Sequence, residues 1–236
     1  MTMLYAAAAV FLGIHLLIAG TRLRDGVTGA IGEGAYLALF SLASLGAIVW
    51  LSMSYGPAQA SADNRLLYDL GPGVRDLGIA VVLLAFLIGV PGLMMANPTT
   101  VGMQNAATKS ETVRGVLRVT RHPFLWGVAL WAAFHLAANG DLASVVLFGT
   151  FLALALLGTM SIDVKRQRKL GAAWDDFARK TSNIPFAAIL SGRNRFEAGE
   201  YFDWRFFAAL LIFAGVLLAH ARVIGVSPFP GGFVPF

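Results

Sequence analysis

Four histidines are the residues of this chain whose side chains could do chemistry: His15, His122, His135 and His220. Each lies within or at the end of a long apolar segment, where ionisable residues are costly and usually serve a function. Imidazole nitrogens inside a membrane bundle can ligate heme iron or another metal, whereas a single buried histidine more often bonds a neighbouring helix. The chain has no cysteine, which excludes disulfides and cysteine-based zinc or iron–sulfur sites.

The spacing of the histidines limits which of them could bind one iron. His122 and His135 are 13 residues apart, which is about 20 Å along a helix, so both cannot ligate the same ion. His15 lies roughly 8 Å inside one end of the first apolar segment, and His122 lies near the same end of the fourth. We therefore predict His15 and His122 as the ligand pair, and His15 with His135, offset by roughly 12 Å, as the alternative. His135 and His220 could form a second pair at the other end, but a packing role explains them better.

Charged residues near His15 and His122 could position such a cofactor. Glu33 opens the second apolar segment, and a carboxylate there could orient a ligand histidine through its second ring nitrogen. An acid is equally favoured there by the helix dipole alone. Arginines at this end could hold heme propionates by bidentate hydrogen bonds, although the charge bias of membrane loops also accounts for them. They are Arg22, Arg24, Arg118 and Arg121.

The elements that carry these residues are apolar enough to cross a membrane. The chain is 57% hydrophobic and only 13% charged, about half the charged fraction of a soluble domain. The sequence predicts an all-α, polytopic membrane helical bundle of about six transmembrane helices, forming one domain over residues 1–236. Because no basic residue precedes the first segment, we expect a retained helix rather than a cleaved signal peptide. The expected spans are Met3–Gly20, Gly34–Met53, Leu77–Ala96, Phe124–Ala138, Leu142–Met160 and Arg205–Val223.

Positive charge is distributed unequally between the two sides of this bundle. Fifteen of the 18 lysines and arginines fall on the side opposite the N-terminus, leaving only Arg65, Arg75 and Arg222. The positive-inside bias predicts a bacterial inner membrane protein with both termini outside and its large basic loops in the cytoplasm. The net charge of +5 is then a property of membrane loops and does not indicate nucleic-acid binding.

The longest basic segment contains a further helix-like stretch, Asp163–Ser182. Leu170, Trp174 and Phe177 share one face of it at helical spacing. We interpret this stretch as a cytoplasmic interfacial helix that lies on the inner leaflet, in preference to a helix that docks a partner protein.

Several stretches of the sequence resemble the NnrU family over nearly the whole chain. They are GIH at 13–15, GEGAY at 32–36, VRGVLRVTRHP followed by FLWG at 113–127, WAAFHLAANGD at 131–141 and IGVSP at 224–228.

The resemblance implies a cofactor more directly than a reaction. The NnrU family includes plant and cyanobacterial 15-cis-ζ-carotene isomerases, membrane proteins that use heme b with histidine ligands. Their likeness maps the ligands to His15 and to His122 of the Arg121–His122–Pro123 motif. The isomerases carry a further histidine near the position of Tyr55, which puts the isomerase reaction in doubt here. Bacterial members are named for an association with denitrification and nitric-oxide metabolism.

The Arg121–His122–Pro123 motif is also similar to isoprenylcysteine carboxyl methyltransferases. Those enzymes bind S-adenosylmethionine with acidic residues after the next helix, where this chain has one acid, Asp163, among several cations. We therefore predict a heme b-binding membrane protein, isomerase-like or linked to redox or nitric-oxide chemistry, with a hydrophobic polyene or other small molecule as its ligand. The alternatives are an S-adenosylmethionine-dependent membrane methyltransferase and a non-catalytic assembly factor.

Overall fold

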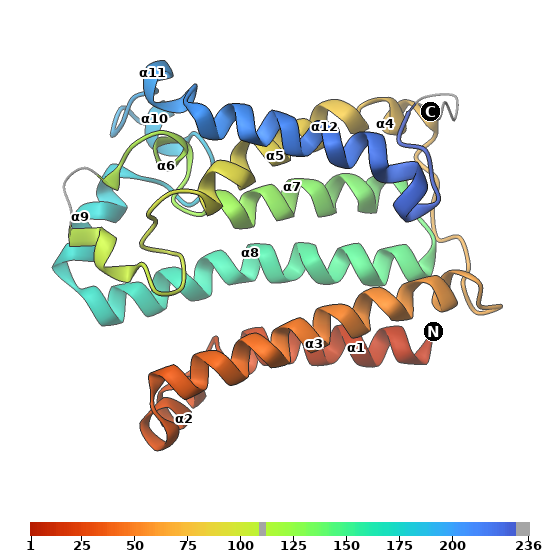
Figure 1. The fold of residues 1–236 in the computed structure, drawn as a ribbon, viewed down its shortest axis with the longest axis horizontal. Helices are drawn as coiled ribbons and strands as arrows, with labels where there is room; N and C mark the ends of the chain where they lie inside the picture. The colour runs from red at the N-terminus through yellow and green to blue at the C-terminus, as the bar shows by residue number, and fades with distance from the viewer. Residues whose placement is uncertain (109–111, 230–236) are drawn as a thin grey trace.

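The computed structural model describes residues 1–108 and 112–229, which are helical without any named strand (Figure 1). The long helices run antiparallel to their sequence neighbours, and α12 ends at the end of the bundle where α1 begins (Figure 1). They are α1 (Thr2–Leu12) with its π-helical continuation η1 (Gly13–Ile18), α3 (Glu33–Gln59), α5 (Gly78–Leu93), α7 (Pro123–Ala138), α8 (Leu142–Leu170) and α12 (Trp204–Ile224).

Short helices gather at the opposite end, which we call the basic end because most of the lysines and arginines lie there. Only α4 (Pro72–Asp76) lies away from it, directly before α5. The others are α2 (Leu23–Ile31), η2 (Gln104–Thr108), α6 (Val116–Val119), α9 (Ala172–Lys180), α10 (Ala187–Leu190) and α11 (Ala198–Tyr201).

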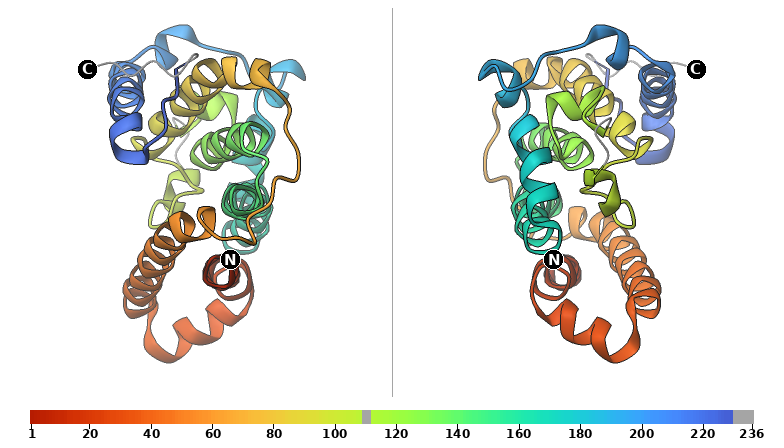
Figure 2. Two further views of the ribbon diagram at one scale, coloured as in Figure 1. Left: turned by 90° about the vertical axis from the view of Figure 1, so that its right-hand side faces the viewer. Right: turned by 90° about the vertical axis from the view of Figure 1, so that its left-hand side faces the viewer.

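The all-α membrane bundle expected from the sequence is confirmed, with fewer helices of spanning length. In the described ranges, α3, the pair α4–α5, α8 and α12 are long and apolar enough to cross a membrane. The α1–η1 helix and α2, which meet at 79°, could form a fifth span. The fourth predicted span, α7, has only 16 residues, fewer than the roughly 20 that a bilayer requires. It packs closely against α5 and α8 in the middle of the bundle (Figure 2).

Helix α1 with η1, the short α2 and α3 form a helical hairpin, which we call the N-terminal hairpin. It stands apart from the rest of the bundle (Figure 2). Its core contact is with α8, where Leu4, Phe11 and Leu51 pack against Leu147 and Phe148. Helix α8 also packs along α7, so it is the element that joins the N-terminal hairpin to the other helices.

The predicted interfacial helix is corrected by the structure. The apolar face of α9 lies inside the protein, with Trp174 3% and Phe177 2% exposed, and so does not face a leaflet. The spacing of the apolar residues in α9 predicts that they share one face, but it does not reveal that other parts of the protein cover that face. By contrast, α2 exposes Leu23, Val27 and Ile31, at positions i, i+4 and i+8, along one side. A short helix with an exposed apolar stripe, bent away from the bundle, has the features of an interfacial helix.

Helices α5 and α7 come into backbone contact at Gly127. A Cβ atom on Gly127 would lie 2.7 Å from the carbonyl oxygen of Ala85 and from Cα of Gly89. The backbone supplies both contacts, so a side chain at residue 127 cannot be accommodated by a rotamer change. A Cβ atom on Gly215, in α12, would have nothing within 4 Å.

We expect Gly127→Ala to lower the free energy of unfolding by about 1–3 kcal/mol relative to Gly215→Ala, because it overpacks the helix crossing. Both changes replace glycine by alanine inside a helix, so the gain in helix propensity is matched. Thermal unfolding in detergent, followed by tryptophan fluorescence, measures the difference. Equal stability of the two variants would mean that α5 and α7 are not in backbone contact.

An ion pair fastens the basic end around α6. Glu200, at α11, accepts hydrogen bonds from Arg118 Nε at 2.7 Å, Arg118 Nη2 at 2.9 Å and the Gly115 amide at 2.9 Å. The hydrogen bonds from Arg118 hold the pKa of the Glu200 carboxyl at about 2, below its ordinary value of 4.5. A depressed carboxyl pKa stabilises the fold above the unfolded-state value and ceases to do so as the folded-state value is passed.

The difference in melting temperature between the wild type and Glu200→Gln should therefore shrink as the pH falls from about 4.5 towards 2. Glu197→Gln is the matched control, because its bridge to Arg195 is exposed and should contribute little. Melting temperatures recorded across this pH range test the expectation. A difference that persists undiminished near pH 2 would show that the charge of Glu200 is not what stabilises this end.

Candidate functional site

A cavity of about 1040 Å³ lies between the N-terminal hairpin and helices α7 and α8. Its inner part is apolar and aromatic, and its part at the basic end, which we call the opening, is lined by charged side chains. Ligand and cofactor sites are typically about 300–1,000 Å³ and largely apolar, with a few polar groups that orient the ligand. The inner part is lined by Phe11, Phe40, Ile48, Phe151 and Leu154.

His15 lines the inner part of this cavity from the π-helical segment η1. Its Nδ1 lies 2.7 Å from the carbonyl oxygen of Phe11, which can only accept, so Nδ1 carries the proton. Nε2 then accepts a hydrogen bond from the Ser44 hydroxyl at 3.0 Å. The rings of Phe11 and Phe40 flank the imidazole, with centroids 4.6 and 5.3 Å away. A rotation of the Ser44 hydroxyl would leave the Nε2 lone pair free to bind a ligand.

Glu33 also lines the cavity, at its charged opening. Its carboxylate lies 3.2 Å from Arg24 and 3.8 Å from Lys169. The second nitrogen of His15 is bonded to Phe11 instead, so the structure does not give Glu33 the orienting role considered from the sequence. Glu33 thus joins the start of α3 to α2 through Arg24 and to the end of α8 through Lys169.

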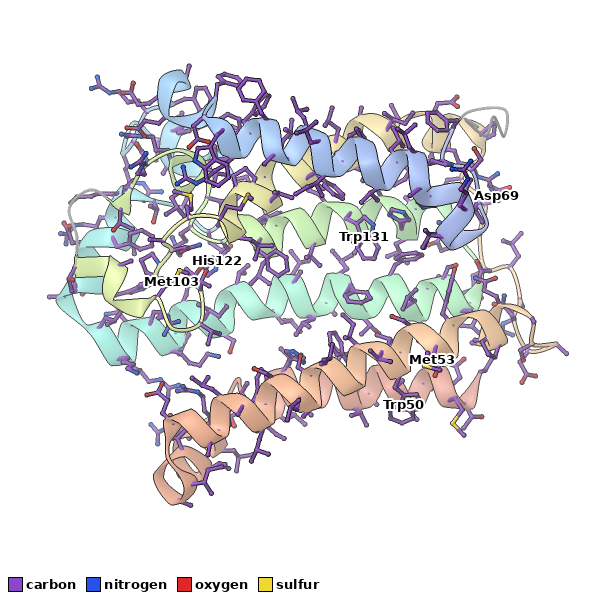
Figure 3. The ribbon with its side chains drawn as sticks, in the orientation of Figure 1. Trp50, Met53, Asp69, Met103, His122 and Trp131 are labelled. Atoms are coloured by element: carbon purple, nitrogen blue, oxygen red, sulfur yellow. The ribbon has the colours of Figure 1, made fainter. Side chains whose placement is uncertain are left out.

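His122 lies in a second cluster, where α7 begins (Figure 3). Its side chain is buried, and Nε2 lies 2.7 Å from Asp163 of α8. Arg121 donates to the same carboxylate through Nε, at 2.9 and 3.1 Å, and through Nη2. Because an ionised carboxylate only accepts, Nε2 of His122 carries the proton. Burial lowers the pKa of His122 and keeps the ring neutral, although Asp163 acts in the opposite direction.

The local sequence holds the Arg–His–Pro motif in this position. The Thr120 hydroxyl accepts from the His122 amide at 3.2 Å and donates to the carbonyl of Asn183 at 2.6 Å. Pro123 occupies the first helical position of α7, where its missing N–H costs nothing. The motif is therefore anchored both to α8 and to the loop after α9.

His135 occupies a third place, far along α7. Its Nδ1 bonds the carbonyl of Trp131 at 2.8 Å, and its ring packs on Trp131 and Phe148, with centroids 5.0 and 4.9 Å away. Trp131 points from α7 towards α8 (Figure 3). His220, in α12, bonds the carbonyl of Val226 at 2.7 Å. These contacts are those of packing histidines.

The predicted site residues are thus divided among three places. His15 and Glu33 line the cavity, His122 and Arg121 meet at Asp163, and His135 lies apart. Within residues 1–108 and 112–229, no three histidine, aspartate or glutamate side chains are arranged to hold a metal ion. Ligation by His15 together with His122 stays a prediction, since this arrangement does not present both imidazoles to the cavity.

The sequence did not single out several residues that line the cavity. Ser44 and Tyr36 lie on α3, and Lys165 and Arg166 lie on α8 beyond the expected end of its span at Met160. The available signal was a helical pattern that continues without interruption through Lys165 and Arg166. It would have extended α8 and placed both residues on the cavity wall.

The fold and the cavity define a helical membrane protein with a ligand-sized chamber that opens at its basic end. Residues 3–228 match the family described as NnrU protein, and the chain belongs to that family. No solved structure matches it.

Two plant proteins are similar to the chain, both described as chloroplastic 15-cis-zeta-carotene isomerase. The protein from Arabidopsis thaliana is 25% identical over 228 residues, covering 92% of this chain and 59% of that protein. The protein from Zea mays is 28% identical over 109 residues, covering 45% of this chain and 30% of that protein. The chain therefore spans less than two thirds of the length of either relative.

We expect Asp163→Asn to lower the free energy of unfolding by about 3–5 kcal/mol, because it leaves the largely buried Arg121 cation without its counter-charge. The control is Asp176→Asn, whose bridges to Arg179 and Lys180 are exposed and should contribute little to stability. Thermal or denaturant unfolding in detergent compares the two variants. A loss no larger for Asp163→Asn than for Asp176→Asn would contradict the cluster as described.

Proposed function

We propose that this chain is an isomerase-like membrane protein that binds an elongated hydrophobic ligand of the polyene class in its cavity, and that it holds heme b there through His15. The observation that carries the proposal is the His15 imidazole in the wall of an apolar cavity of about 1040 Å³. Membership of the NnrU family and the likeness to carotene isomerases support the ligand class.

The residues at the cavity would supply heme b with one iron ligand, His15, and with cations for its carboxylates. Nε2 of His15 is bonded only to a hydroxyl that can rotate away, and the cations at the opening suit the carboxylates of a heme. Arg121, the cation expected there, is instead paired with Asp163. The second predicted ligand, His122, is engaged by the same carboxylate. Heme iron with a single protein ligand keeps an open position for a double bond or a small gas molecule.

The methyltransferase alternative gains no support from the cluster around Asp163. This is the acid that such an enzyme would use for S-adenosylmethionine, and here it is occupied by Arg121 and His122. The charge bias supports a location in the bacterial inner membrane with the basic end in the cytoplasm. A link to nitric-oxide metabolism is compatible with an open iron position and awaits the same heme measurement.

The reaction is tested directly with the compound named for the plant relatives. Protein reconstituted in liposomes with 15-cis-zeta-carotene should change the isomer composition in the dark, as separated by liquid chromatography. Liposomes with the His15→Ala variant are the control. Unchanged composition in the presence of bound heme would favour a redox or gas-binding role instead.

We expect the purified protein to show a heme Soret band that shifts on reduction with dithionite, and His15→Ala to lose it. His122→Ala should retain heme with lower thermal stability, because it removes a bond to Asp163 rather than a cavity ligand. His220→Ala is the matched histidine control, because His220 bonds the carbonyl of Val226, just after its own helix, and does not line the cavity. Absorption spectra of variants expressed with added hemin measure occupancy.

Two outcomes of this experiment would change the assignment. Loss of heme in both His15→Ala and His122→Ala, with a low-spin wild-type spectrum, would establish the pair predicted from the sequence. A flat visible spectrum of the wild type would remove heme from the proposal and leave the hydrophobic ligand to be tested alone.

A further inference from the structure

The opening of the cavity carries more positive charge than the protein neutralises. Five cations line it, against two acids, Asp25 and Glu33. Glu33 is shared between Arg24 and Lys169. Lys165 and Arg166 have no carboxylate within ion-pair distance in the described ranges of the chain. The five cations are Arg24, Lys165, Arg166, Arg168 and Lys169.

Two cations on α8 are held in place by backbone oxygens. Lys165 Nζ donates to the carbonyl of Ala19 at 2.9 Å, and Arg166 Nη2 donates to the carbonyl of Thr100 at 3.0 Å. These bonds tie α8 to the end of the first helix and to the loop after α5. They fix the positions of the two cations without neutralising their charge.

Two hydrogen-bond donors at the same opening are buried without a partner among the described residues. They are Nε of Arg166 and the hydroxyl of Tyr36, and both residues line the cavity. Arg166 Nε–H can only donate, and a buried donor left unbonded costs about 1–3 kcal/mol or more when charged. The Arg24 guanidinium lies over the Tyr36 ring, 5.4 Å from its centroid, so the unbonded hydroxyl lies beside a further positive charge. Such a group of donors and cations is suited to an anionic acceptor.

The rest of the cavity is suited to a different kind of surface. Tyr36 stacks on Phe40 at 5.9 Å between centroids, and Phe40 contacts the His15 ring. From there the wall continues through Phe11 and Phe151, whose rings meet edge to face at 5.6 Å. One end of the chamber thus offers charge and hydrogen-bond donors, and the remainder offers aromatic and aliphatic surface.

We propose that the cavity takes an anionic amphiphile, whose carboxylate or phosphate head accepts from Arg166 Nε–H and the Tyr36 hydroxyl and whose apolar body lies along Phe40, His15 and Phe11. An uncharged polyene would leave both donors unbonded. Two sources share this chemistry, the propionates of a heme and the head group of an acidic membrane lipid. The first source rests on the proposed function, and the second does not.

The test compares ligands that share an apolar body and differ in the charge of the polar group, using the full-length protein in a nonionic detergent. The pairs are oleate with oleyl alcohol, phosphatidylglycerol with phosphatidylcholine, and hemin with hemin dimethyl ester. Titration calorimetry and the shift in melting temperature give the affinities. The charged member of at least one pair should bind about tenfold or more tightly, as one charge-assisted hydrogen bond allows.

Variants assign the preference to the two donors. Arg166→Gln and Tyr36→Phe should each reduce the ratio between charged and uncharged ligands by about tenfold or abolish it. Arg179→Gln, an exposed cation at the same end, and Tyr5→Phe, an exposed tyrosine outside the cavity, should leave the ratio unchanged. Tyr36→Phe removes a single unbonded oxygen, so its folding should be unaffected.

Each outcome separates this proposal from the heme assignment. Preference for oleate or phosphatidylglycerol without hemin binding supports the head-group site while removing heme. Preference confined to hemin over its dimethyl ester assigns the site to propionates. Equal binding within all three pairs, or a preference that survives Arg166→Gln and Tyr36→Phe, overturns the proposal, and heme or polyene binding could still stand.

Discussion

The cavity exists because the N-terminal hairpin packs closely on α8 at one end, whereas at the basic end α3 diverges from α8 and long side chains such as Lys165 and Lys169 bridge α8 and the hairpin. Near the start of α8, Asp141 accepts from Gln59 at 2.9 Å and caps the helix through the Ser144 amide at 3.0 Å. Tyr55 bonds the Ser144 hydroxyl at 2.8 Å. Towards the basic end α3 diverges from α8 (Figure 1), and the cavity opens there. A polar network that strong in a low-dielectric setting leaves the hairpin one anchored orientation.

Hydropathy predicted the membrane helices well because lipid imposes one rule on every span. An apolar run of sufficient length must be helical, so the expected starts of α5, α7 and α8 lie within a residue of those observed. Hydropathy says nothing about which protein surface covers a helix face. The burial of Trp174 and Phe177, and the exposed stripe of α2, depend on tertiary contacts and could not be read from composition. Hydropathy also did not predict that α8 continues beyond Met160, because charged residues end an apolar window without ending a helix.

The candidate site was predicted in its residue types better than in its grouping. His15, one of the predicted site residues, lines the cavity. Depth along a helix cannot decide the direction in which a side chain points, and His122 is turned to Asp163 of α8 instead. The sequence held a sign of this, because Asp163 is the one acid among several cations in residues 161–171. Ser44 and Tyr36 carried no such sign, since their importance comes from facing His15 and Arg24 across the hairpin.

Arg121 and Arg166 show two different environments for a positive charge in this protein. A buried cation is costly unless it is paired and fully hydrogen-bonded. Arg121 donates to Asp163, which also accepts from Nε2 of His122, so the charge of Arg121 is balanced within the protein, while Nδ1 of His122 is buried without a partner among the described residues. Arg166, on the same helix as Asp163, donates to a backbone carbonyl through Nη2, whereas its Nε has no acceptor in the described chain. Groups left unsatisfied in this way are expected at functional sites, where a ligand completes them. The balance of charge therefore favours the cavity over the Arg–His–Pro cluster as the place where the proposed anionic ligand would bind.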